Sequence, residues 1–300
     1  MLGLGNDCLF PLYIPIDGYH GAIRVRCGHC IYCKMAKSRE WSLRLEMESQ
    51  YWRDLCFVTL TYDNENLPYH IVDKELILDD GQGRQNSVDD FYFPSLAYDD
   101  ITLYLKRLRK CLDHPIRYFA VGEYGTRRGR PHWHILFFGL SGVGDIGRLI
   151  KEKWDKGFVD ITPFFPETCS YVAGYVQKKL YGRDRSIFRL PEVMRCSHHL
   201  GEKWLFDHIN EFDDDHPYIS KNGFKYAIPR HFRKILVKLG VLKESSMLAL
   251  SLKQLDEYAL LEEDCRNKGI TLSEFFDGRW RNALAKDCRK NSRRDITGDI

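Results

Sequence analysis

Two strand-length apolar runs separated by a short turn constrain the fold of this chain more than any other feature. The first run is IRYFAVGEY (Ile116–Tyr124), the second is HWHILFF (His132–Phe138), and GTRRGRP lies between them. Neighbouring strands joined by a glycine-bearing turn pair as an antiparallel hairpin. The chain is therefore expected to contain an antiparallel sheet that includes this hairpin.

The segments on either side of the hairpin alternate between helical and strand patterns. Apolar periodicity and short β-branched runs predict, in chain order, strands and helices over residues 56–62, 99–112, 116–124, 132–138, 145–156, 158–164 and 167–180. Their order is strand, helix, strand, strand, helix, strand, helix. This is the split βαββαβ order of an α+β fold of the RRM/ferredoxin-like type, with helices on one face of an antiparallel sheet and a closing helix.

The sequence patterns divide the chain into four parts. Residues 1–54 are a Cys-rich segment followed by a helix, and residues 55–182 are the predicted core. Residues 183–240 are interpreted as an extension of the core with an acidic loop, and residues 241–300 as a mainly helical, charged tail. Within the core, residues 63–97 contain prolines and the sequence GQGRQNS, so they are expected to form a long loop or insertion.

Charge is unevenly distributed, although the net charge is only +3. Residues 101–134 hold eight Lys and Arg residues against two acidic ones. Such a segment suits a phosphate backbone, and its candidates for DNA contact are Lys106, Lys110, Arg127, Arg128 and Arg130. A solvated helix face next to a charged turn would give the same composition, so charge alone does not decide between the two.

Nothing in the sequence indicates a membrane or an export route. No apolar run approaches the roughly 18 to 20 residues that a membrane-spanning helix needs. The N-terminal sequence MLGLGNDCLFPLYIPIDG lacks the basic start and the cleavage site of a signal peptide. A cytoplasmic protein without a membrane partner is expected, and its ten cysteines are expected to be mostly thiols or metal ligands rather than disulfides.

Two histidines at alternate positions begin the second strand of the hairpin. Residues two apart in a strand project from the same face, so His132 and His134 point together and Trp133 points to the opposite, helix-covered face. Two imidazoles on one face can bind a divalent ion. The hairpin turn brings Glu123 back beside His132, which makes its carboxylate the candidate third ligand. Such a pair also occurs on half-exposed strands without any function, and the spacing does not exclude that.

The helix predicted over residues 167–180 carries two tyrosines four residues apart. Tyr171 and Tyr175 share one helix face, and Lys178 lies three residues beyond Tyr175. A phenol, with an ordinary pKa of about 10, is a weak nucleophile at neutral pH. Attack on a phosphodiester by such an oxygen needs a cation that draws charge from the phosphate and a neighbour that favours the phenolate. A histidine-bound metal and a lysine would supply both; taken alone, the tyrosine pair fits aromatic core packing better.

Three segments together carry a family resemblance. FVTLTYD, GEYG followed by GRPHWHILFFG, and YVAGYVQKKL resemble, in this order, the motifs of HUH endonucleases that initiate rolling-circle replication. The chain is most similar to the initiators of microviruses, which are single-stranded DNA bacteriophages, and in particular to the gokushovirus type. The strong motifs span residues 57–179, whereas EVMRCSHHLGEKW (Glu192–Trp204) departs from the family pattern.

The resemblance implies roles for individual residues. The implied catalytic residues are Tyr171, Tyr175 and Lys178, and the implied metal ligands are His132, His134 and Glu123. The family's metal is Mg²⁺ or Mn²⁺. Thr59 and Thr61 belong to the first motif, whose role would lie mainly in the strand scaffold.

The implied reaction is cleavage of one strand of single-stranded or locally melted DNA at a phage origin. It leaves a 5′-phosphotyrosine and a free 3′-OH, and a second transesterification later rejoins the strand. The resemblance also implies action in the bacterial host cytoplasm, with the host helicase and DNA polymerase as partners. Two alternatives remain open: a non-catalytic RRM-like binder of single-stranded nucleic acid, and a plasmid relaxase, whose metal motif typically has a third histidine.

The N-terminal segment holds a second candidate metal site. Cys27, Cys30 and Cys33 follow a C-x₂-C-x₂-C pattern, and Cys8 lies upstream. Three thiols at this spacing can surround one tetrahedral ion with Cys8 as the fourth ligand, and a structural Zn²⁺ is the preferred interpretation. An iron–sulfur cluster or plain thiols would use the same residues.

Overall fold

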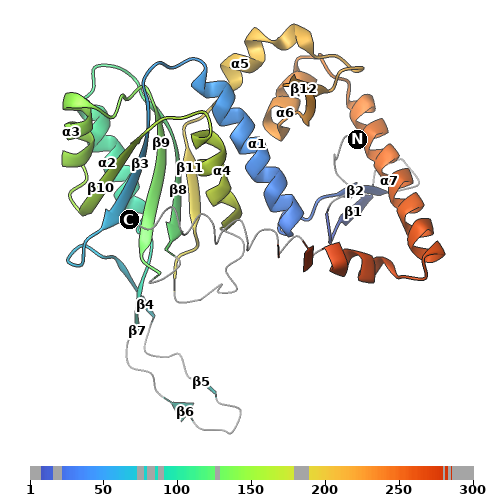
Figure 1. Ribbon diagram of the computed structural model, residues 1–300, viewed down its shortest axis with the longest axis horizontal. Helices are drawn as coiled ribbons and strands as arrows, with labels where there is room; N and C mark the ends of the chain where they lie inside the picture. The colour runs from blue at the N-terminus through green and yellow to red at the C-terminus, as the bar shows by residue number, and fades with distance from the viewer. Residues whose placement is uncertain are drawn as a thin grey trace. The chain divides into compact units, whose positions relative to one another are not determined.

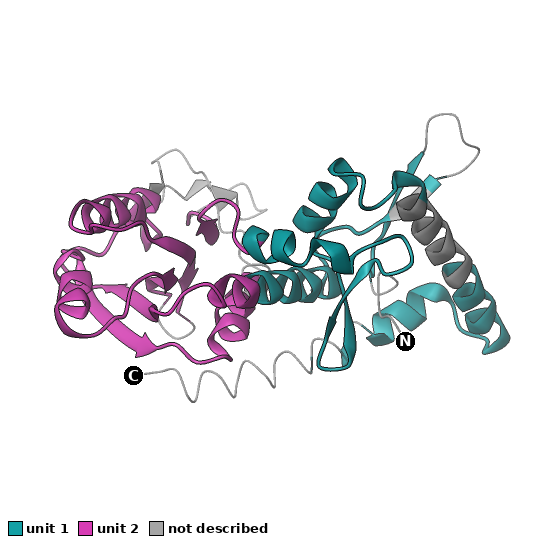
Figure 2. Ribbon diagram, turned by 90° about the horizontal axis from the view of Figure 1, so that it is seen from above, with its two compact units in different colours: residues 1–44, 202–300 teal, residues 45–201 magenta. Residues whose placement is uncertain are grey.

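The computed structural model describes residues 8–15, 22–72, 78–79, 85–86, 91–125, 129–178, 189–279, 281–282 and 285 (Figure 1). The chain divides into two compact units (Figure 2). One unit runs from Leu45 to Gly201, and the other combines Met1–Arg44 with Glu202–Ile300. Among the described residues, no helix is both long enough and apolar enough to cross a membrane.

The unit of residues 45–201 contains the expected antiparallel sheet. Its main elements are β3 (Leu55–Tyr62), α2 (Tyr98–Lys110), β8 (Arg117–Tyr124), β9 (Pro131–Phe138), α3 (Gly144–Glu152), β10 (Gly157–Pro163), α4 (Thr168–Lys178) and β11 (Val193–Cys196). In the described part of the chain this sheet has five strands in the order β10–β3–β9–β8–β11, and all neighbours run antiparallel. The α+β class and the β8–β9 hairpin are confirmed. Strand β11, formed by VMRC, is an addition that the sequence patterns do not predict.

Alternation along the strands gives the sheet two different faces. On one face, alternate positions of β3 and β9 are buried in the core, namely Val58, Leu60, Tyr62, Trp133, Ile135 and Phe137. Helices α2 and α3 cover this face, with Tyr104 and Ile150 among their core residues, and α4 lies on the other side of the sheet (Figure 1). Each fully buried apolar side chain contributes about 1.5–3 kcal/mol. The face of Trp133 is therefore the main core of this unit.

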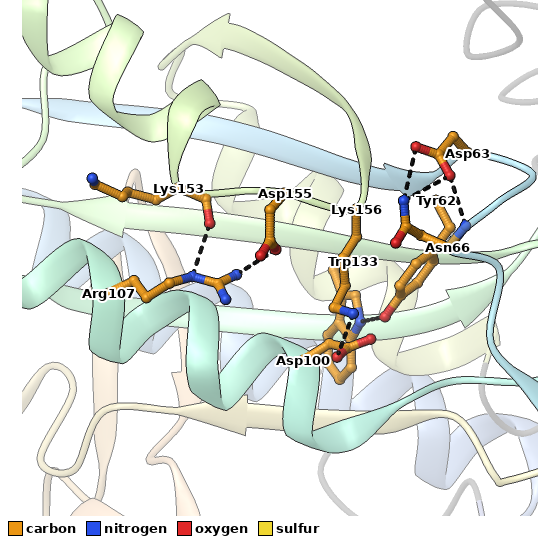
Figure 3. A network of polar contacts seen from close by, with 9 residues as sticks. All are labelled: Tyr62, Asp63, Asn66, Asp100, Arg107, Trp133, Lys153, Asp155 and Lys156. Atoms are coloured by element: carbon orange, nitrogen blue, oxygen red, sulfur yellow. Dashed lines mark hydrogen bonds and ion pairs between the residues drawn. The ribbon is translucent and has the colours of Figure 1, made fainter.

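Polar contacts tie α2 to the segment between α3 and β10 (Figure 3). Arg107 Nε donates a hydrogen bond to the Lys153 carbonyl at 3.2 Å, and its Nη2 lies 2.7 Å from Asp155 Oδ1. Asp100, in the first turn of α2, has Oδ1 3.4 Å from Lys156 Nζ. These contacts position α2 along the core face.

The insertion between β3 and α2 contains short strands. β4 (Tyr69–Val72) pairs with β7 (Phe91–Pro94), and β5 (Leu78–Asp79) pairs with β6 (Gln85–Asn86). The expectation of a long loop is therefore wrong for these residues. YHIV and FYFP are rich in β-branched and aromatic residues, which suit a strand, but they pair across an interval whose glycines and prolines dominate the sequence pattern.

The unit of residues 1–44 and 202–300 consists of small elements. They are β1 (Leu12–Pro15), β2 (Ala22–Val25), α1 (Ile31–Ser49, which extends into the other unit), α5 (Glu202–Asp207), the 3₁₀-helix η1 (Ile209–Glu211), β12 (Tyr218–Lys221), β13 (Phe224–Ala227), α6 (Arg230–Lys238) and α7 (Glu244–Asn267). β1 pairs with β2 and β12 pairs with β13, both antiparallel. Phe232 of α6 is fully buried, and the Arg44 guanidinium lies 5.6 Å from its ring centroid and 4.3 Å from that of Trp41. An arginine between two aromatic rings thus connects α1 with α6.

Candidate active site

Strand β9 presents its two histidines on the face of the sheet opposite Trp133. In the register of the sheet, His132 lies between Thr61 of β3 and Glu123 of β8, and His134 lies between Thr59 and Val121. His134 is 8% exposed, His132 is half-buried and Trp133 is fully buried in the core. The shared face that strand alternation predicts for the histidines is therefore observed.

Two threonine hydroxyls of β3 hold the imidazoles. Thr59 Oγ1 lies 3.1 Å from His134 Nδ1, and Thr61 Oγ1 lies 3.2 Å from His132 Nδ1. With Nδ1 engaged in each ring, Nε2 is the nitrogen left for a metal or a substrate. The sequence predicts a scaffold role for these threonines and misses this contact. The signal for it is the T-x-T spacing of β3, which matches the H-x-H spacing of β9.

The carboxylate of Glu123 turns toward His134 rather than His132. It is only 5% exposed, and its Oε1 lies 3.0 Å from His134 Nε2. The sequence predicts that Glu123 lies beside His132, which is its direct partner in the register. The diagonal contact forms because side chains on adjacent strands also reach neighbours two residues along the partner strand.

The positions of Glu123 and His134 fit a divalent ion. Adjacent ligands of an octahedral ion with bonds of about 2.1 Å lie about 3.0 Å apart, and Glu123 Oε1 and His134 Nε2 are separated by 3.0 Å. His132 is further away, since the two imidazole centroids are 6.4 Å apart. Among the described residues, the three side chains do not bring their ligand atoms within 4.8 Å of one another. Two of the three predicted ligands thus meet, and His132 lies beside them.

Helix α4 places both predicted tyrosines against the histidine face. The ring of Tyr175 stacks on that of His134, with centroids 4.1 Å apart and planes at 10°. Tyr171 meets Tyr175 edge-on at 5.1 Å, and the two hydroxyls are hydrogen-bonded to each other. Because the metal-type ligands and the phenols come together, the arrangement can bring an oxygen nucleophile and a cation to one phosphate.

An aromatic residue that the sequence does not single out completes this packing. Phe57 of β3 stacks on His134 with centroids 5.8 Å apart, and it meets Tyr171 edge-on at 5.7 Å. Phe57 lies two residues before Thr59, so strand alternation puts both on the same face. Position Phe57 therefore connects β9 with α4, and the alternation along FVTLTY is the signal for it.

The predicted DNA-contact residues fall into three groups. Arg127 and Arg128 lie outside the described residues. Arg130 donates hydrogen bonds to the Tyr62 carbonyl at 2.8 Å and to Asn64 Oδ1 at 2.9 Å, so it ties the end of the β8–β9 turn to the end of β3. The third group, Lys106 and Lys110, is exposed on α2, which covers the other face of the sheet and so does not line the histidine face.

Two further expectations for this unit can be compared with the structure. Lys178 is the last residue of α4, and its side chain lies outside the described residues. Phe119 shares a strand with Glu123 and is expected to stack a base, but it is fully buried. That expectation is wrong, because strand alternation indicates a face and not how far helices and loops cover it.

The four N-terminal cysteines come together in the other unit. Cys27 Sγ lies 3.9 Å from Cys33 Sγ, and Cys30 Sγ lies 4.0 Å from Cys8 Sγ. All four sulfurs lie within 4.8 Å of one another, and none forms a disulfide. The predicted grouping of these residues is therefore observed.

Comparisons with known proteins give this geometry a context. A family model of replication-associated proteins, the ORF2 family, matches residues 55–180, which contain the strands and the helix of the candidate site. The replication-associated protein ORF4 of Chlamydia phage 1 is 30% identical over 253 residues, or 75% of this chain and 57% of that protein. The replication-associated protein ORF2 of Spiroplasma virus 4 is 32% identical over 235 residues, or 69% of this chain and 66% of that protein.

A third relative, the replication-associated protein VP4 of Bdellovibrio phage phiMH2K, is 28% identical over 230 residues, or 69% of this chain and 65% of that protein. The chain thus spans 57% to 66% of the length of these relatives. No solved structure matches it. By the family model and the three phage relatives, the chain belongs to the ORF2 family of replication-associated proteins.

Proposed function

We propose that the chain is a replication initiator that cleaves one strand of DNA at a phage origin by tyrosine transesterification. The observation that carries this proposal is the stacking of Tyr175 on His134, with centroids 4.1 Å apart, beside the carboxylate of Glu123. The relatives are replication-associated proteins of phages, which supports origin DNA, single-stranded or locally melted, as the substrate.

We further propose that residues 55–178 form an HUH endonuclease core of the split βαββαβ, RRM/ferredoxin-like type. The element order β3, α2, β8, β9, α3, β10 and the sheet order β10–β3–β9–β8 support this. In this arrangement β3 and β9 are adjacent, so the segments FVTLTY and PHWHILFF lie side by side. The neighbouring strands bring the first and second motifs to one site.

A Mg²⁺ or Mn²⁺ ion would be held by His134, Glu123 and His132. Bound there, the ion would draw negative charge from the scissile phosphate. The protein orients the ligands, because the hydroxyls of Thr59 and Thr61 engage Nδ1 of the two imidazoles and leave Nε2 as the ligand atom.

The proposed chemistry exchanges one phosphodiester for another and needs no other energy source. A phenolic oxygen loses its proton and forms a bond to phosphorus, while the bond from phosphorus to the 3′ oxygen breaks. The 3′ oxygen takes up a proton and becomes a free 3′-OH. In the later step a 3′-OH attacks the phosphotyrosine, which rejoins the strand and restores the phenol. Lys178, at the end of α4, is the proposed basic helper for the phenolate.

We assign the first attack to Tyr171. Tyr175 is only 7% exposed and its ring lies on His134, whereas Tyr171 is half-buried and more accessible to a phosphate. The two hydroxyls are hydrogen-bonded, so the Tyr175 hydroxyl can donate to the oxygen of Tyr171. A donor to the charged form favours the phenolate and thereby activates Tyr171.

An assay with a labelled origin oligonucleotide tests the proposal. With Mg²⁺, the wild-type protein should become covalently attached to the 5′ side of the nick. Loss of the nucleophile in Tyr171→Phe should slow the first cleavage at least about 10³-fold, and loss of one hydrogen bond in Tyr175→Phe should slow it about tenfold. The double variant should form no adduct, whereas the exposed Tyr226 of β13 offers a control, and Tyr226→Phe should cleave like wild type.

The possible results separate the alternatives. An adduct formed by the double variant would mean that the nucleophiles are assigned wrongly, and a larger effect of Tyr175→Phe than of Tyr171→Phe would reverse their order. Binding of the oligonucleotide without any cleavage by wild type would favour the non-catalytic RRM-like binder. The full burial of Phe119 argues against that reading, because such binders stack bases on exposed aromatics in mid-strand.

We propose that the protein acts in the host cytoplasm together with the host DNA polymerase and helicase. The proposed nick supplies the free 3′-OH that a polymerase extends. Extension from a nick in a duplex also requires separation of the strands, which is the work of a helicase. These partners follow from the proposed reaction and fall with it if no 3′-OH is produced.

A further inference from the structure

The unit of residues 1–44 and 202–300 contains a group of four cysteine sulfurs that the proposed nuclease reaction does not use. They come from three segments: Cys8 precedes β1, Cys27 follows β2, and Cys30 and Cys33 lie just before and within the first turn of α1. All four are at least 92% buried, and their sulfurs lie within 4.8 Å of one another. Three separate segments therefore converge on one point.

The sulfur positions match the corners of a tetrahedron around a single ion. A tetrahedral zinc with Zn–S bonds of about 2.3 Å places its sulfurs about 3.8 Å apart. The Cys27–Cys33 and Cys8–Cys30 separations, which share no residue and so correspond to opposite edges, are 3.9 and 4.0 Å. Disulfides would bring paired sulfurs to about 2 Å, and all four cysteines are free.

Backbone N–H groups point at three of these sulfurs. The amide of Cys27 donates to Cys8 Sγ at 3.3 Å, that of Cys30 to Cys27 Sγ at 3.3 Å, and that of Leu9 to Cys30 Sγ at 3.5 Å. Gly28 has φ +83°, a conformation that side chains rarely adopt, and it forms the turn that brings the Cys30 amide back to Cys27. Such donors stabilise the negative charge of metal-bound thiolates.

An ordinary core thiol in this chain has different surroundings. Cys56 is fully buried among the apolar residues of the sheet core, and burial raises its pKa to about 12. Such a thiol is a small apolar side chain surrounded by other apolar side chains. The four N-terminal cysteines face one another instead, which is the arrangement of a ligand set.

We propose that Cys8, Cys27, Cys30 and Cys33 bind one structural Zn²⁺. Thiolates select zinc over Mg²⁺ and Mn²⁺, which prefer oxygen ligands, so this site is chemically distinct from the proposed nuclease site. The compact sulfur group suits a mononuclear site, because the ligand sulfurs of a four-iron cluster lie outside a body of iron and sulfide. The ion links the β1–β2 hairpin to the start of α1. This inference does not depend on the proposed nuclease function.

Metal analysis of the purified full-length protein tests the site. Wild type should contain one zinc per chain, and the His132→Ala/His134→Ala variant should keep it, because the histidines belong to the other site. Cys30→Ser should lose most of the zinc, whereas Cys111→Ser, at an exposed cysteine outside the group, should retain it. Wild type without zinc, wild type with iron in its place, or full zinc content in Cys30→Ser would overturn the proposal.

A measurement on wild type alone covers the case in which Cys30→Ser does not fold. Protein produced with Co²⁺ in place of zinc should show the intense visible and charge-transfer absorption of tetrahedral cobalt bound to thiolates. The His132→Ala/His134→Ala variant should show the same spectrum. The faint spectrum of six-coordinate cobalt, or an intense one that vanishes in the histidine variant, would contradict a four-cysteine site.

Discussion

At the scale of single residues, two hydroxyl groups determine how the histidines can act. Thr59 and Thr61 each lie opposite a histidine in the register of β3 and β9, and each hydroxyl reaches Nδ1 of its partner. An imidazole held at one nitrogen presents the other in a defined direction. The first motif thus contributes to the candidate site directly and not only as part of the scaffold.

The small size of Gly125 also shapes this site and leads to a prediction. A Cβ added at Gly125 would lie 2.9 Å from His132 Nε2, which is closer than the ring can tolerate without shifting. Gly125→Ala should therefore displace the proposed ligand while leaving all ligand residues in place. We expect a 10-fold to 100-fold higher Mn²⁺ requirement for cleavage, the range found when the surroundings of a metal ligand are disturbed.

The Mn²⁺ dependence of origin cleavage measures this effect, with circular dichroism as a check of folding. Gly278→Ala is a matched control, since a Cβ there would meet nothing within 4 Å. An unchanged Mn²⁺ requirement in Gly125→Ala would argue against His132 as a ligand.

At the scale of elements, a buried glutamate connects the last turn of α1 with the sheet of the same unit. Glu48 is 2% exposed, and its Oε1 accepts hydrogen bonds from Arg117 of β8 at 2.7 Å and from Trp52 at 2.8 Å. Its Oε2 accepts one from the Gly201 amide at 2.7 Å. In the sequence, Glu48 interrupts an apolar helical stripe, and this network explains why a charge is tolerated there.

Removal of Glu48 should therefore destabilise the sheet unit. Glu48→Ala leaves the Arg117 guanidinium without its carboxylate and two further donors without an acceptor, which should lower the free energy of unfolding by about 3–5 kcal/mol. Urea denaturation followed by tryptophan fluorescence measures the change. Glu46→Ala, at a half-buried position outside this network, should change the stability by less than about 1 kcal/mol. Similar losses in the two variants would show that the network does not stabilise the unit.

At the scale of the whole molecule, two metal sites of different chemistry are proposed, and chelation should distinguish them. EDTA should abolish origin cleavage, because Mg²⁺ and Mn²⁺ bind carboxylate and imidazole reversibly, and added Mg²⁺ should restore it. DNA binding should persist within about twofold, since backbone phosphates are contacted mainly by Lys and Arg. Cleavage assays and binding curves before and after chelation measure both effects. Continued cleavage in EDTA would remove the metal role of His132, His134 and Glu123.

Much of the fold and of the candidate site follows from local sequence patterns. Alternation along HWHILFF puts the two histidines on one face, and the four-residue spacing of Tyr171 and Tyr175 puts both phenols on one side of a helix. The glycine-bearing turn between two apolar runs determines the hairpin. These properties depend on residues close together in the chain, so the sequence by itself determines them.

Contacts between distant segments were decided only by the tertiary structure. Packing of α2 and α3 against Trp133 puts Lys106 on the face away from the histidines, and packing of α4 puts Tyr175 on His134. The choice of His134 over His132 by Glu123, the addition of β11 and the burial of Phe119 also arise from such contacts. Period and spacing tell which residues share a face, but the segment that covers that face is selected by the packing free energy of the whole unit.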